Sequence, residues 1–226
     1  MAKQYSETRE RAMQPATLIR AGSWAAIAAG VLLAADVAAH VLFGVDDTFR
    51  SARLWGMPHE LWHIPGIAGV VLALFGLMTI YARQAREVGW LGLVGFVLLF
   101  IGMVVGAAFS TIFHAIFLPD LERAAPTLLE GLLKSATPAE VVRGVVVQAV
   151  GLGLGGLLFG LATVRARVLP PTGGWLFMAG ALVGAANQVT LVAQVVARLV
   201  FAIGFVILGY GTRPKTSVPS IGHGFE

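Results

Sequence analysis

The sequence predicts an all-α fold, in which residues 1–226 form a single membrane domain with six transmembrane helices packed as one bundle. Of its 226 residues, 57% are hydrophobic and only 12% are charged, whereas soluble domains carry roughly a quarter charged residues. The apolar residues are gathered in runs long enough to cross a bilayer, and most charged residues stand between the runs. We therefore expect lipid to be the main solvent of this chain.

The spans follow from the lengths of these runs. A hydrocarbon core about 30 Å thick requires about 20 residues of apolar helix. The block from Gly174 to Tyr210 is too long for one helix of ordinary tilt and is interrupted by Asn187 and Gln188, so we divide it in two. The predicted spans are 22–43, 61–81, 90–117, 141–164, 174–188 and 192–210. The first run exceeds the core of a typical secretion signal, and we expect it to remain as a helix.

Basic residues predict the orientation. Six spans place most Lys and Arg on the side of the two chain ends, and the other side carries most of the acidic residues. Because basic loops stay in the cytoplasm, both termini are predicted to be cytoplasmic, in a multi-pass protein of a bacterial cytoplasmic membrane. The net charge of +4 is thus a topology signal and does not predict a nucleic-acid partner. An aromatic belt is expected at the cytoplasmic boundary, from Trp24, Tyr81, Trp90, Trp175 and Tyr210.

The outer loop from Pro119 to Glu140 has its own apolar pattern. Its apolar residues recur at near-helical spacing and predict a short amphipathic helix along the outer surface. They are Leu121, Ala125, Leu128, Leu129, Leu132 and Leu133.

Two segments of the chain resemble each other. Gly76–Arg83 and Gly160–Arg167 share a Gly-Leu-x-Thr pattern ending in Ala-Arg, and each is followed by Gly-Trp-Leu. This suggests a parallel duplication of a two-helix unit, a pattern found in transporters. The alternative is convergence, because small residues, Arg and Trp recur at membrane boundaries anyway. Glycines four residues apart in the third and fourth spans predict close helix packing, within the bundle or against other subunits in a homo-oligomer or complex.

The polar residues within the spans fall in the outer half, and the inner half has only Thr79 and Thr163. Asp36 and Arg198 are each about seven residues from the outer end of their spans, or about 10 Å. Since an isolated charge there costs several kcal/mol, we expect these two to form an ion pair between the first and last helices. Such a pair has a role in chemistry or only fixes the register of the helices.

Histidines add a candidate metal or haem site. Asp36 and His40 share a helix face, and so do His59 and His63. With Glu60 and His114, these side chains form a ligand set that divalent metals accept, and His63 and His114 are the candidate ligands of a haem iron. The alternative is that they are hydrogen-bonded polar residues with no ligand. The chain has no cysteine, which excludes thiolate sites.

His59-Glu60-Leu61-Trp62-His63 also matches the H-E-x-x-H zinc protease motif. That chemistry needs the motif on a continuous helix with a third ligand, and Pro65 is expected to kink such a helix. Protease activity is therefore a remote alternative.

In the Gly76–Gln84 stretch and in the Phe113–Asp120 segment, the chain resembles a broad group of uncharacterised bacterial six-helix membrane proteins. The resemblance implies a fold and a location, and no functional residue. Three functions stay open: a membrane protein that binds a metal ion or haem in an outer polar pocket, a non-catalytic subunit or scaffold, and a small-solute transporter.

Overall fold

The computed structural model describes residues 15–43, 63–108, 112–128, 131, 146, 149–185 and 191–214. These residues are almost entirely helical, and no strand occurs among them. The bundle is built from α2 (Pro15–Phe43), α4 (Ile64–Gly102), α9 (Gly155–Ala166), α10 (Pro171–Ala185) and α11 (Leu191–Gly211). Three π-helices, η1 (Met103–Ala108), η2 (Phe113–Phe117) and η3 (Ala149–Leu154), and the short α6 (Leu118–Ala124) complete the described elements.

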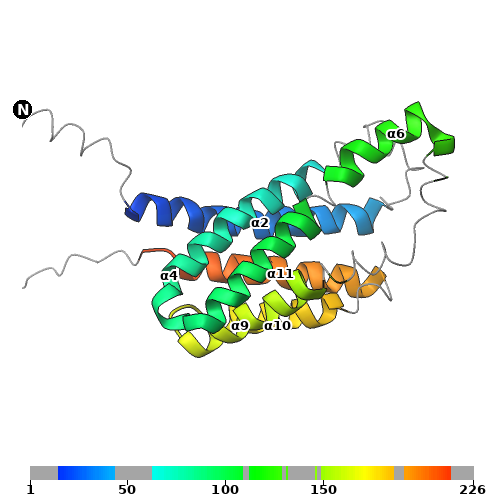
Figure 1. Cartoon of the computed structure of the whole chain (residues 1–226). Coiled ribbons are helices and arrows are strands. Elements are labelled where there is room, and N and C mark those ends of the chain that lie inside the picture. The colour runs from blue at the N-terminus through cyan, green and yellow to red at the C-terminus, as the bar shows by residue number, and fades with distance from the viewer. Residues whose placement is uncertain are drawn as a thin grey trace, which may run out of the picture.

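Helix α4 is a hairpin of two helical halves. Gly89 has φ 55° and ψ −157°, a non-helical conformation that breaks the helix. The rings of Tyr81 and Phe96 stack with centroids 4.4 Å apart, although fifteen residues of straight helix would separate them by about 22 Å. The two halves therefore run antiparallel, and the turn at Gly89 lies at one end of the bundle (Figure 1).

The helices form a closed ring in chain order. α2 packs against the first half of α4, the second half of α4 against α9, α9 against α10, and α10 against α11, which returns to pack against α2. The end that holds Gly89 also holds the start of α2, the α9–α10 turn and the end of α11, and we name it the Gly89 end (Figure 1). The opposite end, where α6 lies, is the α6 end.

Small residues let α2 and α4 approach closely. The contacts run in antiparallel order along the two helices. Going along α2, Gly22 meets Thr79, Ala26 meets Gly76, Leu33 meets Gly69 and Asp36 meets Gly66. A Cβ added to Gly76 would lie 2.6 Å from Ala26 Cα, and one added to Gly69 would lie 3.0 Å from Leu33 Cγ. Such contacts stabilise helix pairs in membranes by van der Waals packing.

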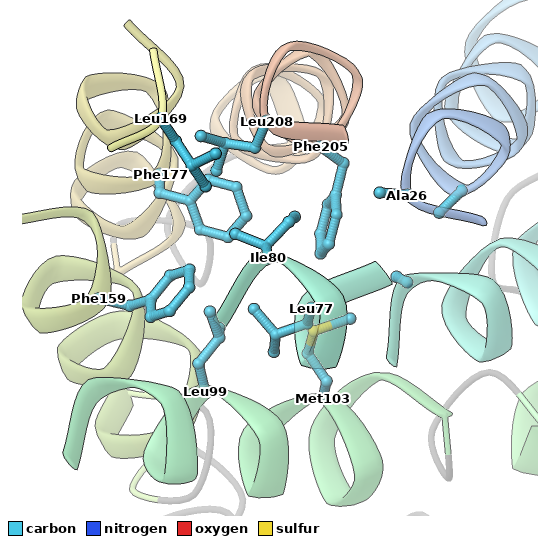
Figure 2. Close-up of a cluster of buried hydrophobic side chains, with 12 residues drawn as sticks. Ala26, Leu77, Ile80, Leu99, Met103, Phe159, Leu169, Phe177, Phe205 and Leu208 are labelled. Carbon is cyan, nitrogen blue, oxygen red and sulfur yellow. The ribbon is translucent and has the colours of Figure 1, made fainter. Parts of the chain in front are cut away.

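The centre of the ring is filled with apolar side chains. Phe177 is fully buried and meets Phe159, Phe201 and Phe205 edge-on, with centroids 5.8, 5.2 and 5.1 Å away. Figure 2 shows Leu77, Ile80 and Leu99 from the α4 hairpin pointing into the same cluster. Edge-to-face ring geometry adds to the stabilisation that burial provides.

The outer surface of the bundle is also apolar. Large hydrophobic side chains such as Phe75, Met78, Ile101 and Leu182 are at least half exposed. Three helical stretches of the described chain are long and apolar enough to cross a membrane, Pro15–Ala39, Ile64–Gly106 and Ala149–Ala166, and Pro171–Val183 and Val195–Gly211 are shorter apolar helices. The described residues are thus helical and apolar both inside the bundle and on its outside, which is typical of a membrane protein.

The predicted spans correspond to helices with shifted boundaries. The first helix starts at Pro15, before the predicted residue 22, and the first half of α4 continues past residue 81 to the turn at Gly89. The block from Gly174 to Tyr210 does form two helices, α10 and α11. α6 begins within a residue of the predicted amphipathic helix, whose members Leu129, Leu132 and Leu133 lie outside the described residues.

Most of the predicted aromatic belt is exposed at the Gly89 end. Trp24, Trp90, Trp175 and Tyr210 have exposed fractions of 54%, 81%, 56% and 67%. Tyr81 differs, because its ring stacks on Phe96 inside the hairpin and packs against the core cluster.

Candidate functional site

Asp36 is buried at the α6 end of the α2–α4 seam. Its side chain is only 7% exposed and faces the first turn of α4. A Cβ added to Gly66 would lie 2.6 Å from Asp36 Oδ1 and 2.9 Å from Cγ, so glycine leaves the space that the carboxylate fills. The free backbone N–H groups of a helix start carry partial positive charge, which stabilises a carboxylate there.

His63 lies at the same place. It is the N-cap residue of α4, is 5% exposed, and its carbonyl accepts the N–H of Ile67 at 2.9 Å. Pro65 falls in the first turn of α4, where proline is tolerated, so the expected kink is absent. His63 and Asp36 thus lie within one turn of Gly66, and a buried imidazole and a buried carboxylate share one end of the seam.

The other predicted ligands are only partly described. His40 and His114 belong to α2 and η2, but their side chains lie outside the description, and so do His59 and Glu60 entirely. Among the described residues, no group of three or more potential metal ligands occurs. His63 precedes the helix instead of lying within it, which differs from the placement that the protease motif requires.

Two of these positions belong to the α6 end of the bundle. Asp36 lies opposite Gly66, so three residues further Ala39 reaches the level of His63, and His40 follows directly. His114 lies in η2, which directly precedes α6. Three histidine positions and Asp36 therefore belong to the α6 end of neighbouring elements.

The expected ion pair between Asp36 and Arg198 does not form. The Arg198 side chain is exposed, and within the described part of the chain it makes no ion pair. The reason is the seam, because Asp36 continues the face of α2 that meets α4, whereas Gly30 marks the face that meets α11 at Ala202.

Two π-helices lie at one of the close approaches between α4 and the η3–α9 helix. A Cβ on Gly102 would lie 2.6 Å from Gly151 Cα, and η1 starts at the next residue, while Gly151 itself lies in η3. π-helices are rare and are frequent at functional sites, because the extra residue redirects side chains. Both π-helices lead toward the α6 end, where the candidate residues lie (Figure 1).

Buried polar residues also occur toward the Gly89 end, where sequence reasoning expected little beyond two threonines. Gln84 is 1% exposed and donates from Nε2 to Thr163 Oγ1 at 2.9 Å, which ties the two hairpins together. The Ser23 and Thr212 hydroxyls hydrogen-bond at 2.7 Å and join the start of α2 to the end of α11. The sequence signal for both hydrogen bonds was a polar residue near the end of a helix, next to a basic loop.

The repeated segments share one local detail. Thr79 donates to the Phe75 carbonyl at 3.2 Å, and Thr163 donates to the Phe159 carbonyl at 2.9 Å. Their turns differ, because the left-handed residue is Gly89 in the first hairpin and Arg167 in the second. Close helix packing within the bundle is confirmed at several glycines, as at Gly95 against Phe159 and Gly160 against Gly174.

Comparisons of this chain with family models, with curated proteins and with solved structures found no match.

Proposed function

We propose that the chain crosses the membrane six times, with both termini in the cytoplasm, and binds a divalent metal ion at the extracytoplasmic α6 end. The six spans are α2, the two halves of α4, the η3–α9 helix, α10 and α11. The charge distribution supports this orientation. At the Gly89 end, the described residues include several arginines, and Glu87 is the one described acidic residue there, so basic residues are in clear excess. These arginines are Arg20, Arg83, Arg86, Arg165, Arg167 and Arg213.

The observation that carries the metal site is the burial of Asp36 and His63 within one turn of Gly66. Imidazole and carboxylate are ligands for zinc and related divalent ions. His40 and His114, at the same end of the bundle, are the further ligands of this proposal. Burial of ionisable groups inside a membrane is costly and usually marks a functional site.

An ion fits this position better than a haem does. The seam is closed at Gly66, where even one added carbon would overlap the Asp36 carboxylate. A porphyrin needs a wide flat space between its axial ligands, whereas a metal ion needs only converging side chains. A Soret absorption band in purified protein would contradict this choice.

Metal binding is tested by titrating detergent-purified, metal-stripped protein with Zn²⁺ and by measuring its metal content as isolated. Asp36→Asn and His63→Gln are each expected to weaken Zn²⁺ binding at least about tenfold, an effect that even outer-shell partners of a metal have. Asp120→Asn is the matched carboxylate control, because Asp120 is exposed and pairs with Arg123 at 2.6 Å. His223→Gln is the histidine control, being far from the site in sequence.

A scaffold role predicts a different result from the same variants. If Asp36 and His63 only hold α2 against α4, the wild-type protein binds no more Zn²⁺ than the Asp36→Asn and His63→Gln variants do. The variants then lose thermal stability without any change in metal content. That outcome would replace the metal site with the scaffold interpretation.

The transporter hypothesis requires an aqueous path through the bundle. The centre of the ring is occupied by Phe159, Phe177, Phe205 and their neighbours (Figure 2). This packing favours a binding protein over a conduit.

The orientation can be tested with single cysteines, because the natural chain has none. In intact spheroplasts, a membrane-impermeant maleimide is expected to label Asp120→Cys and to label Arg86→Cys only after lysis. Both positions are exposed, so accessibility reports the side of the membrane. Labelling of Arg86→Cys in intact spheroplasts would overturn the proposed topology.

A further inference from the structure

Arg213 stacks on two aromatic rings at the Gly89 end. Its guanidinium carbon lies 3.9 Å from the centroid of the Trp24 ring and 4.7 Å from that of Tyr210. We call these three residues the Arg213 clamp. Cation–π contacts of this kind orient the guanidinium and leave its in-plane N–H groups as donors.

The clamp is held by the hydrogen bonds that join the ends of α2 and α11. Thr212 is fully buried, shares a 2.7 Å hydrogen bond with Ser23, and donates to the Gly209 carbonyl at 2.8 Å. The Arg213 N–H donates to the Tyr210 carbonyl at 3.3 Å. The backbone that carries the guanidinium is therefore fixed before any ligand binds, which lowers the entropic cost of binding.

The guanidinium of Arg213 has N–H donors that are not used within the described part of the chain. No described residue accepts a hydrogen bond from the Arg213 side chain, and its Nε atom is buried. Arg20 is exposed and lies one helical turn before Trp24, so a second positive charge flanks the clamp. This arrangement suits a phosphodiester, which accepts two parallel N–H bonds from one guanidinium.

The position of the clamp identifies the source of that phosphate. Trp24 and Tyr210 are more than half exposed on the outside of an otherwise apolar surface, as in the aromatic belts at bilayer headgroups. We propose that the Arg213 clamp binds the headgroup phosphate of an anionic phospholipid. This inference depends on the protein being embedded in a membrane and is independent of the metal site.

The test compares protein in nanodiscs of phosphatidylcholine alone and of phosphatidylcholine with an equal amount of phosphatidylglycerol. Native mass spectrometry after release measures how many phosphatidylglycerol molecules each protein retains. Wild-type protein is expected to retain at least one tightly, and Arg213→Gln is expected to bind it about tenfold more weakly. Arg165→Gln is the matched control, because Arg165 is also exposed at this end but is not stacked on aromatic rings.

Equal losses in Arg213→Gln and Arg165→Gln would show only general surface electrostatics and would overturn the site. If Arg213→Gln does not fold in phosphatidylcholine nanodiscs, Arg213→Lys is tested in its place. Lysine keeps the charge but not the two-point geometry, so retention should still fall below that of the Arg165→Gln control. Displacement of the lipid by millimolar inorganic phosphate would assign the site to free phosphate and would also overturn the proposal.

Discussion

Replacing Gly102 with alanine is expected to lower the free energy of unfolding by about 2–3 kcal/mol. The added Cβ would lie 2.5 Å from the carbonyl carbon and 2.6 Å from Cα of Gly151. Both contacts are with backbone, which cannot turn aside as a flexible side chain can. The second half of α4 must then separate from η3, and the neighbouring layers lose dispersion contacts.

The measurement is unfolding of the variant in mixed micelles as the denaturing detergent fraction rises, followed by circular dichroism. Gly131→Ala is the control, because a Cβ at Gly131 meets nothing within 4 Å. Alanine is the better helix former by about 1 kcal/mol, so the control should be neutral or slightly stabilised. Similar stability of the two variants would mean that Gly102 and Gly151 do not touch in the membrane.

Replacing Gly89 with alanine is expected to destabilise the protein by about 1–3 kcal/mol, because its backbone conformation is one that only glycine adopts easily. Its φ of 55° and ψ of −157° allow the α4 hairpin to turn without a loop. No atom lies within 4 Å of an added Cβ, so the cost would come from backbone strain alone. Thermal unfolding in detergent measures the loss.

Arg167→Gly is the companion variant, and it is expected to raise the stability of the protein instead of lowering it. Arg167 ends α9 with φ 53° and ψ 21°, the left-handed conformation that costs a side chain about 1–2 kcal/mol. Glycine at this C-cap should therefore stabilise the α9–α10 turn by about 0.5–1 kcal/mol. If Gly89→Ala were as stable as wild type, the α4 turn at Gly89 would have a backbone conformation other than the one described here.

The helices were predictable because their signals are strong and local. Long apolar runs located α2, both halves of α4, α9, α10 and α11, whereas Asn187 and Gln188, where the last block was divided, lie outside the described residues. Helix ends were less predictable, because helices continue through charged residues such as Arg20 and Arg86, whose long side chains are exposed.

The candidate site stays a prediction, whereas the expected pairing of Asp36 with Arg198 was wrong. Depth alone suggested Arg198 as the partner of Asp36, but depth does not say which way a side chain faces. The small residues from Gly22 to Ala29 and from Gly66 to Gly76 carry that information, since the glycines of α4 meet the face of α2 that ends in Asp36. The π-helices η1 and η3 had no comparable signal in the sequence, because the one extra residue in a π-helical turn leaves the apolar composition of the segment unchanged.

The closed ring has a consequence for folding. Gly30 of α2 approaches the Ala202 backbone of α11, so the contact that closes the ring joins two helices that lie far apart in the described chain. Each pair of helices that are neighbours in the chain can pack as soon as both are made, whereas closure waits for α11. The pairing of α2 with α11 therefore has the largest loop to close and is expected to form after the pairings within the hairpins.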